Sequence, residues 1–263
     1  MVILFSNLPL ITVITAVYNG EQFLDETIKS IISQDYGNVE YIIIDGGSTD
    51  GTLDIIRKYE HVIAHWVSEE DNGISDAFNK GIQLSSGELI NFQGDGDGFV
   101  DNTALTKIAQ KSLSSPNSFV SGKIRRIDLS GNELYVSKQQ VPFNKKSLLY
   151  RMSLPHQGLF TRRSFFEKYG LFDVNNTYCM DYEHLLRAYD DFPEVEFVED
   201  VVANWRDDGL GNGNTLKIFQ EYHKIKQENH VASDIHLEFI KYWIYSKYFL
   251  KVSLSAVFRK LRN

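Results

Sequence analysis

The chain is poor in cysteine, in basic residues and in long apolar runs, and each shortage excludes something. Its 263 residues include one cysteine, Cys179, so no internal disulfide can form and the composition suits a reducing compartment. Asp and Glu number 35 against 27 Lys and Arg, and the net charge of −8 argues against a nucleic-acid partner, because phosphate backbones require a basic surface. No stretch reaches the roughly 18 uninterrupted apolar residues of a membrane span.

The N-terminal segment is apolar but lacks the features of a targeting sequence. Residues 1–5 carry no basic flank, and Asn7 and Pro9 soon interrupt the apolar run, so we expect no signal peptide. Together with the lone cysteine, this predicts a cytoplasmic protein.

The first hundred residues alternate between the patterns of strands and helices. Residues 11–17 form a continuous β-branched run, which is typical of a strand buried on both faces, and residues 21–33 repeat apolar side chains at helical spacing. The same alternation continues with expected strands at 39–44, 62–68 and 88–92 and expected helices at 52–59 and 74–84. It predicts an α/β fold with a mainly parallel central sheet, right-handed crossovers and flanking helices.

The second half of the chain is less regular. Residues 118–128 and 133–136 flank a Ser-Gly-Asn turn and predict a hairpin. A short strand at 159–161 and helices at 163–169 and 181–189 follow, and from residue 215 onward the pattern is helical throughout. Since no clear linker interrupts the chain, we predict a domain over 1–214 with a helical C-terminal extension over 215–263.

Two acids follow the expected strand at 88–92. Asp95 and Asp97 lie in a glycine-rich loop, where two carboxylates repel each other unless a cation lies between them. A hard divalent cation is the usual partner, and it brings phosphate with it. The loop is not an EF-hand, because the twelfth position from Asp95 is Thr106 rather than Glu. The alternative is a solvated acidic turn, since Asp-Gly pairs are common in turns.

Further polar residues lie at the ends of the first strands. Asp45 ends the second strand before two glycines and can accept from a nucleobase or a ribose, or can form an Asx turn or helix cap. No Lys follows it as in a P-loop. Asp76, Asn79 and Lys80 share about one helical turn, where they can line a nucleotide site or form an ordinary polar helix surface.

Two later residues have side chains suited to proton transfer. Asp181 opens a helix, whose N-terminal N–H groups stabilise its anionic form, so it is either a base or a plain cap. His156, in a Pro-His-Gln-Gly segment, is a candidate contact to an acceptor or a diphosphate, although a lone His is more often structural.

The C-terminal tail differs in charge from the rest of the chain. Residues 237–263 contain six basic residues and one acid, a local charge of +5 in a chain of −8, and they are rich in aromatic rings. Rings and amines on one helix suit peripheral contact with an anionic membrane, and equally suit a terminal helix that packs its rings on the body.

Six segments of the chain, taken in order, resemble family 2 glycosyltransferases. They include IDGGSTDGT at 44–52, SEEDNGISDAFNKG at 68–81, GELINFQGDGDGF at 87–99 and DYEHLLR at 181–187, together with 11–19 and 155–173. The likeness extends from residue 10 to about residue 210. Within the family, the chain is similar to the bacterial enzymes that build surface polysaccharides. It implies the GT-A fold, which is Rossmann-like.

The resemblance also implies roles for the acidic residues. Glu21 and Asp45 would hold the uracil and ribose of a UDP-sugar with Asp76 nearby, Asp95 would contact ribose or metal-bound water, Asp97 would ligate Mn²⁺ or Mg²⁺, and Asp181 would be the general base. The implied reaction is inverting transfer of a sugar to a glycan or lipid-linked acceptor at the cytoplasmic face of the membrane. Two departures stand out: Gly96 separates acids that are commonly adjacent, and Met180 replaces the acid that often precedes the base.

Two other functions compete with transfer. A non-catalytic nucleotide-sugar-binding protein with a degenerate site is disfavoured because all three central acids are present. A nucleotidyltransferase usually has a glycine-rich, basic loop after its first strand, and residues 17–21 lack one.

Overall fold

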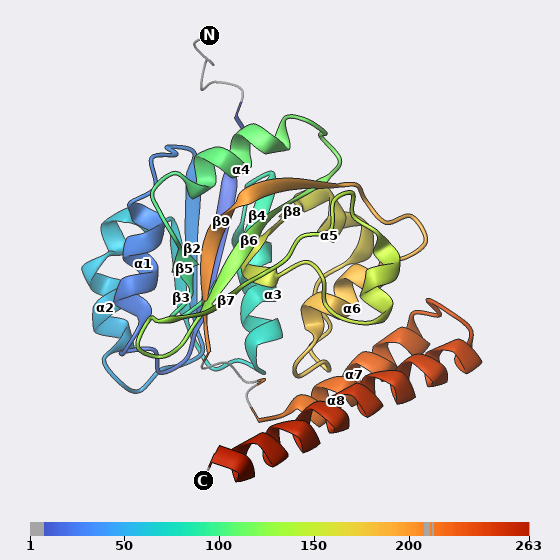
Figure 1. Ribbon diagram of the computed structural model, residues 1–263. Coiled ribbons are helices and arrows are strands. Elements are labelled where there is room, and N and C mark those ends of the chain that lie inside the picture. Colours follow the sequence, from blue (N-terminus) through green and yellow to red (C-terminus); the bar gives the residue numbers. More distant parts are fainter. Residues whose placement is uncertain (1–7, 208–210, 212, 263) are drawn as a thin grey trace.

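A single curved sheet organises the part of the chain that the computed structural model describes, residues 8–207, 211 and 213–262 (Figure 1). Within these residues nine strands pair in the order β3-β2-β1-β4-β8-β6-β9-β5, with β7 paired to β6. The strands are β1 Ile11–Val17, β2 Val39–Asp45, β3 His65–Ser68, β4 Leu89–Gly94, β5 Gly98–Phe99, β6 Phe119–Ile127, β7 Glu133–Val136, β8 Leu159–Arg162 and β9 Val195–Arg206. The predicted α/β fold is confirmed.

Helices cover both faces of the sheet. They are α1 Leu24–Ile32, α2 Thr52–Lys58, α3 Ile74–Leu84, α4 Ala104–Ser112, α5 Arg163–Tyr169, α6 Met180–Arg187, α7 Thr215–Glu228 and α8 Asp234–Arg262, with short 3₁₀ turns at η2 Glu60–Val62, η3 Lys145–Leu149 and η4 His156–Gly158. The helices α1 and α2 lie on one side and α3 on the other (Figure 1). None of the helices in the described ranges is both long enough and apolar enough to cross a membrane.

The strands β3, β2, β1 and β4 are parallel, as predicted, and β8 then pairs with β4 in the antiparallel direction. Side chains of β1 alternate between two cores, because Val13 packs with the α1 side and Ile14 with the α3 side. Gly81 lets α3 approach the sheet closely, since a Cβ there would lie 2.4 Å from Cγ2 of Ile14. The register pairs Val17 with Asp45 and Ala16 with Gly94, so three carboxyl ends meet at one edge.

The expected secondary structure was wrong in several places. The strand expected at 62–68 begins only at His65, because residues 60–62 form the 3₁₀ turn η2. The strand β9 was missed: its apolar residues are interrupted by the exposed Glu199 and Asp200, where its register with β6 shifts. The helix α4 was missed as well. The C-terminal region, predicted to be helical from residue 215 onward, forms the two helices α7 and α8, separated by residues 229–233.

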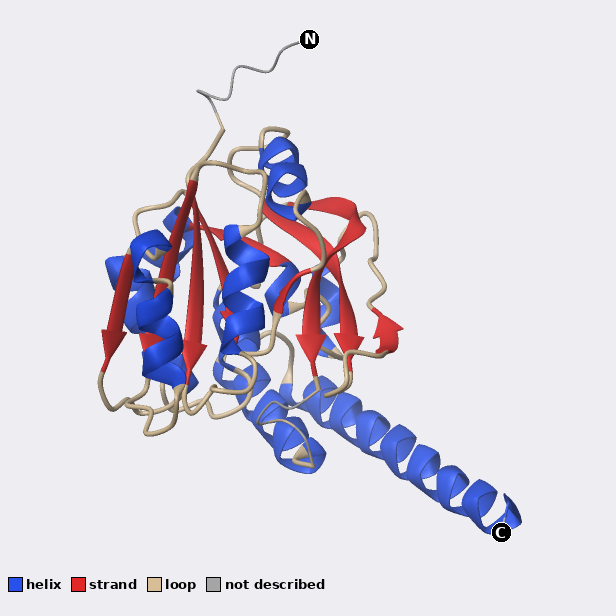
Figure 2. Cartoon of the chain, turned by 90° about the vertical axis from the view of Figure 1, so that its left-hand side faces the viewer, coloured by secondary structure: helices blue, strands red, loops and turns tan. Residues whose placement is uncertain are grey.

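The C-terminal helices share a hydrophobic core with the body. Ile225, Leu237 and Ile240 are fully buried in a cluster with Leu148 and Tyr182, which belong to η3 and α6. Beyond this cluster α8 extends away from the sheet to its C-terminal end (Figure 2). The boundary at 214/215 remains a prediction, but the extension is packed against the domain at its base.

Candidate active site

The loop after β4 is held in a closed turn by donors from three parts of the chain. Asp97 is only 8% exposed, and its Oδ1 accepts from the Arg206 backbone N–H at 3.0 Å. Its Oδ2 accepts from the side-chain amide of Gln157 at 3.0 Å and from the Gly94 N–H at 3.2 Å. The intervening Gly96 takes a φ of +85°, which L side chains rarely adopt. The carboxylate is therefore fixed in position rather than free to move with the loop.

Asp95 lies against the chain that follows β1. A Cβ on Gly20 would stand 2.4 Å from Cγ2 of Val17 and 2.7 Å from Asp95 Oδ2, so a larger residue at position 20 would displace these side chains. Among the described residues no cluster of three or more His, Cys, Asp or Glu side chains could by itself hold a metal ion. Mg²⁺ bound together with a substrate diphosphate uses only one or two protein carboxylates. The hard oxygen donors of Asp95 and Asp97 therefore fit such a cation.

Asp45 organises its own loop. The side chain is fully buried and accepts from the backbone N–H groups of Gly47 at 3.2 Å and Ser48 at 3.0 Å, and from the hydroxyls of Ser48 and Ser68. This is the Asx-turn alternative of the sequence analysis. A direct contact of Asp45 with a nucleotide stays a prediction. The hydrogen bonds that Asp45 makes in the structure hold the conformation of the loop that follows β2.

The other residues predicted to bind the sugar donor lie at the N-termini of helices. Glu21 is exposed, and its Oε2 accepts from the N–H of Gly51, the N-cap of α2. Asp76 accepts from the N–H of Asn72 at 3.0 Å and lies 3.8 Å from Lys80 Nζ. Asn79, in contrast, is buried and exchanges two hydrogen bonds with the backbone of Phe172. The three residues predicted on one turn of α3 therefore separate, with Asn79 facing the core.

The structure brings Asp181 and His156 together although 25 positions separate them. The His156 Nδ1 lies 3.9 Å from Asp181 Oδ2, and the Asp181 Oδ1 accepts from the Tyr182 N–H at 2.8 Å. The imidazole stacks on Phe92 with ring centroids 5.1 Å apart. Burial lowers the pKa of His156, and the nearby Asp181 only partly opposes this shift. The histidine is therefore neutral near pH 7.

The η4 turn links the two ends of the site. His156 faces Asp181, and the next residue, Gln157, donates to Asp97. Since adjacent residues contact both acids, Asp97 and Asp181 flank one short turn at the edge of the sheet. These acids come from the β4 loop and from α6, so the structure joins elements that are distant in sequence.

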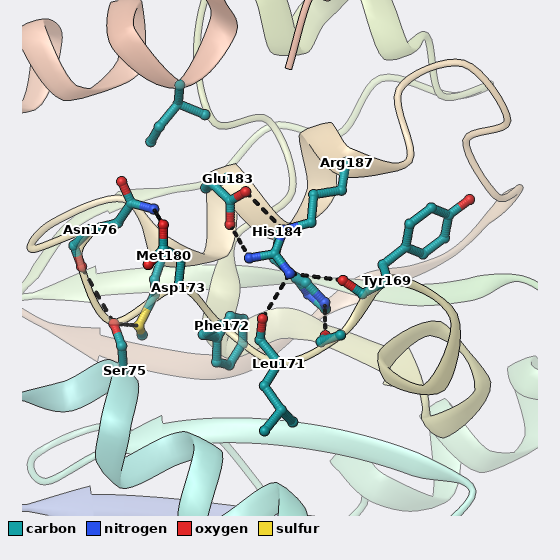
Figure 3. A network of polar contacts seen from close by, with 12 residues as sticks. Ser75, Tyr169, Leu171, Phe172, Asp173, Asn176, Met180, Glu183, His184 and Arg187 are labelled. Atoms are coloured by element: carbon teal, nitrogen blue, oxygen red, sulfur yellow. Dashed lines mark hydrogen bonds and ion pairs between the residues drawn. The ribbon is translucent and has the colours of Figure 1, made fainter. Parts of the chain in front are cut away.

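An ion pair between the buried Glu183 and the half-buried Arg187 fixes the helix that carries Asp181. The Arg187 guanidinium donates to both carboxylate oxygens of Glu183, at 2.8 and 2.6 Å, and to the carbonyls of Tyr169 and Leu171, each at 2.8 Å (Figure 3). His184 Nε2 is 2.7 Å from the Gly170 carbonyl oxygen. The network ties α6 to the loop after α5.

We expect Arg187→Met to lower the free energy of unfolding by about 3 kcal/mol, because Glu183 would be left buried without its partner. Urea denaturation monitored by circular dichroism measures this loss. The double variant with Glu183→Gln is the control, because it removes the uncompensated charge and should recover part of the stability. A loss below about 1 kcal/mol in the single variant would contradict this role for the pair.

Comparison with known proteins identifies the family. The family model described as glycosyl transferase family 2 matches residues 12–180, more than half of the chain. The chain belongs to glycosyl transferase family 2. It is therefore a glycosyltransferase, as the resemblance predicted.

The most similar curated relatives include mycobacterial proteins. This family 2 glycosyltransferase is 33% identical over 186 residues to an uncharacterized glycosyltransferase of Mycobacterium tuberculosis, covering 68% of this chain and 69% of the relative. It is 28% identical over 215 residues to a PGL/p-HBAD biosynthesis glycosyltransferase of Mycobacterium bovis, covering 79% and 80%.

Solved structures share the fold of this family 2 glycosyltransferase. The S. aureus TarS fragment 1–349 in complex with UDP-GlcNAc has a TM-score of 0.68 at 16% identity, covering 91% of this chain and 72% of that one. The Pyrobaculum calidifontis mannosyltransferase PcManGT, in complex with GDP-Man and Mn²⁺, has a TM-score of 0.66 at 17% identity, covering 96% and 76%. These similarities confirm the predicted GT-A fold.

Two supporting residues of this family 2 glycosyltransferase were missed in the sequence analysis. Arg206 is 6% exposed; its guanidinium donates to the Gly96 carbonyl at 3.1 Å and to Glu26 at 2.7 Å. Glu221 of α7 accepts from the N–H groups of Tyr178 and Cys179, each at 2.9 Å, and so caps the helix of Asp181. No local pattern marks either residue, because the hydrogen-bond partners of Arg206 lie at least 77 positions away and those of Glu221 lie 42 and 43 positions away.

Proposed function

We propose that this glycosyltransferase transfers a hexosyl or N-acetylhexosaminyl group from a UDP-sugar to a glycan or lipid-linked acceptor by single displacement with inversion. One observation carries the proposal: the His156–Gln157 turn contacts both Asp181 and Asp97. A base and a diphosphate-binding acid held next to adjacent residues of one turn would both lie near the reacting carbon of a bound donor. The ligands named for the structural relatives, UDP-GlcNAc and GDP-Man, agree with a nucleotide-sugar donor.

In this mechanism Asp181 accepts the proton of the acceptor hydroxyl as the oxygen attacks the anomeric carbon. Its Oδ1 is held by the Tyr182 N–H, which leaves Oδ2, on the side of His156, to receive the proton. A divalent cation bound with the donor would offset the negative charge that the departing diphosphate gains. Asp97 and Asp95 would hold that cation, and Gln157 and Arg206 keep Asp97 oriented toward the donor.

The donor is tested with a panel of nucleotide-sugars. We expect one or more UDP-sugars to raise the melting temperature of the full chain in the presence of Mn²⁺, and we expect EDTA to remove the effect. Slow hydrolysis of the same donor without acceptor, measured as the release of UDP, would distinguish an enzyme from a protein that only binds the donor. A thermal shift that is equal with EDTA, or produced only by GDP-sugars, would contradict the proposal.

The proposed acceptor is part of surface polysaccharide assembly at the cytoplasmic face of the membrane. The outer face of α8 supports this location, because it exposes Phe239 and Tyr242, each at 67%, and Phe249 at 52%, on a helix that also carries lysines. Rings that lie at headgroup depth with amines on anionic lipid are typical of interfacial helices.

We expect the triple variant Phe239→Ser, Tyr242→Ser and Phe249→Ser to lose most binding to vesicles containing anionic lipid, because each ring contributes apolar area at the interface. Sedimentation with vesicles measures the bound fraction. Leu113→Ser with Leu134→Ser, two similarly exposed apolar residues of the body, is the matched control. Equal binding by the triple variant and the wild type would show that α8 does not dock on lipid. Deleting α8 is less informative, because its first turns belong to the core.

A further inference from the structure

A pocket lies at the base of the C-terminal helices, apart from the loop of Asp95 and Asp97. It encloses about 190 Å³ between α7, α8 and the chain that follows η3. Its walls combine apolar rings, among them Tyr222 and Tyr245, with the basic residues Arg151, His223, Lys226 and Lys241. None of these residues has a part in the proposed transfer reaction.

Lys226 is the most unusual member of the pocket. Its side chain is 2% exposed, and its Nζ donates to the Leu149 carbonyl at 3.1 Å. No carboxylate of the described residues forms an ion pair with it. Burial lowers the pKa of Lys226 to about 8, so the amine is still mostly charged at pH 7. A buried cation without an anion is costly, and one neutral carbonyl uses only one of its three donors.

Two other basic groups of the pocket, His223 and Lys241, share one acid. Glu238 lies 2.9 Å from His223 Nε2 and 2.9 Å from Lys241 Nζ. The buried Nδ1 of His223 has no hydrogen-bond partner in the described part of the chain. The pocket therefore carries an excess of positive charge that an anion would satisfy, next to rings that would accept an apolar group.

We propose that this pocket binds a phosphate monoester whose organic group is apolar. The phosphate would pair with Lys226 and reach the guanidinium of Arg151, and the apolar chain would lie against the rings of Tyr222 and Tyr245. Tyr222 also packs on Tyr182, the neighbour of Asp181, with ring centroids 4.3 Å apart. A ligand in the pocket would therefore contact a residue, Tyr222, that packs against α6. The inference is independent of the proposed donor and acceptor, because it concerns binding alone.

The test is calorimetric titration of the full chain, without nucleotide-sugar, using decyl phosphate below its micellar concentration. We expect Lys226→Met to weaken binding at least about tenfold, since a charge-assisted contact is lost. Lys224→Met on the same helix is the matched control, because Lys224 is 59% exposed and pairs with Glu228. Lys226→Met removes an uncompensated buried charge, so its melting temperature without ligand should equal or exceed that of the wild type.

Three further probes separate the sources of the binding energy. Decanol, which lacks the anion, should bind weakly or not at all, and inorganic phosphate should bind more weakly than decyl phosphate. Vesicles with phosphatidate that bind in a Lys226-dependent manner would identify a lipid as the source, whereas binding of the soluble ester alone would identify a free metabolite; both outcomes support the site. Equal affinity of Lys226→Met and wild type for decyl phosphate, equal affinity for decanol, or no binding of decyl phosphate would overturn the proposal.

Discussion

Asp181→Asn is expected to reduce sugar transfer by roughly 10²–10⁴-fold, the usual contribution of a general base. Asparagine has the same shape, and its oxygen can still accept from the Tyr182 N–H, so the helix start should keep its conformation. The amide cannot take the proton of the acceptor hydroxyl. Turnover with saturating donor and acceptor measures the loss, and calorimetry should give an unchanged dissociation constant for the donor.

The control for this variant is Asp190→Asn, which removes an exposed acid that follows the same helix. We expect normal transfer from it. Near-normal turnover by Asp181→Asn would remove Asp181 from the role of base, whatever the donor affinity. If both turnover and donor affinity fell together, Asp181 would be a binding residue rather than the base.

Asp97→Asn is expected to make donor binding independent of metal. Losing a residue that only orients a metal ligand typically lowers metal affinity about 10–100-fold. Replacing the proposed ligand itself should lower metal affinity at least as much. The donor affinity of the variant in Mn²⁺ should then match that of the wild type in EDTA. Calorimetric titration of the donor with and without Mn²⁺ measures both values.

The fold must be checked separately, because Asp97 also accepts hydrogen bonds from Arg206, Gln157 and Gly94. The side-chain amide of Asn would place its own N–H groups against some of these donors, where no hydrogen bond can form. A lower melting temperature is therefore expected for the variant. Asp101→Asn is the control, since Asp101 is the next acid along the chain and caps its own turn. An Mn²⁺-dependent gain in donor affinity that survives in Asp97→Asn would contradict the metal role.

Much of the first half of the fold was predictable from local sequence because its central strands β1, β2 and β4 are largely buried. Residues 11–17 and 39–44 are rich in apolar and β-branched side chains, and the structure buries every residue of β1. The second half was predicted less well because its strands are partly exposed and irregularly paired. In β9 the pattern Val-Glu-Asp-Val reads as a loop, and only its pairing with β6 and β5 makes it a strand.

The candidate site was likewise predictable only in part. The position of Asp95 and Asp97 after a buried strand indicated that they lie at the carboxyl edge of the sheet, where ligands of parallel sheets bind. The Asx turn of Asp45 with Gly47 and Ser48 was one of the alternatives that the sequence left open, whereas its hydrogen bond from Ser68 was not predicted. The Ser68 hydrogen bond depends on how β3 places this residue beside the end of β2.

The sequence by itself determined the family, the parallel half of the sheet and the acids that follow its strands, because these depend on hydrophobic runs and short motifs that are read locally. Only the tertiary structure decided that His156 faces Asp181, that Gln157 and Arg206 hold Asp97, and that Lys226 is buried without an acid. Each of these contacts joins residues at least 25 positions apart. Their geometry follows from how whole elements pack, and no local pattern encodes that packing.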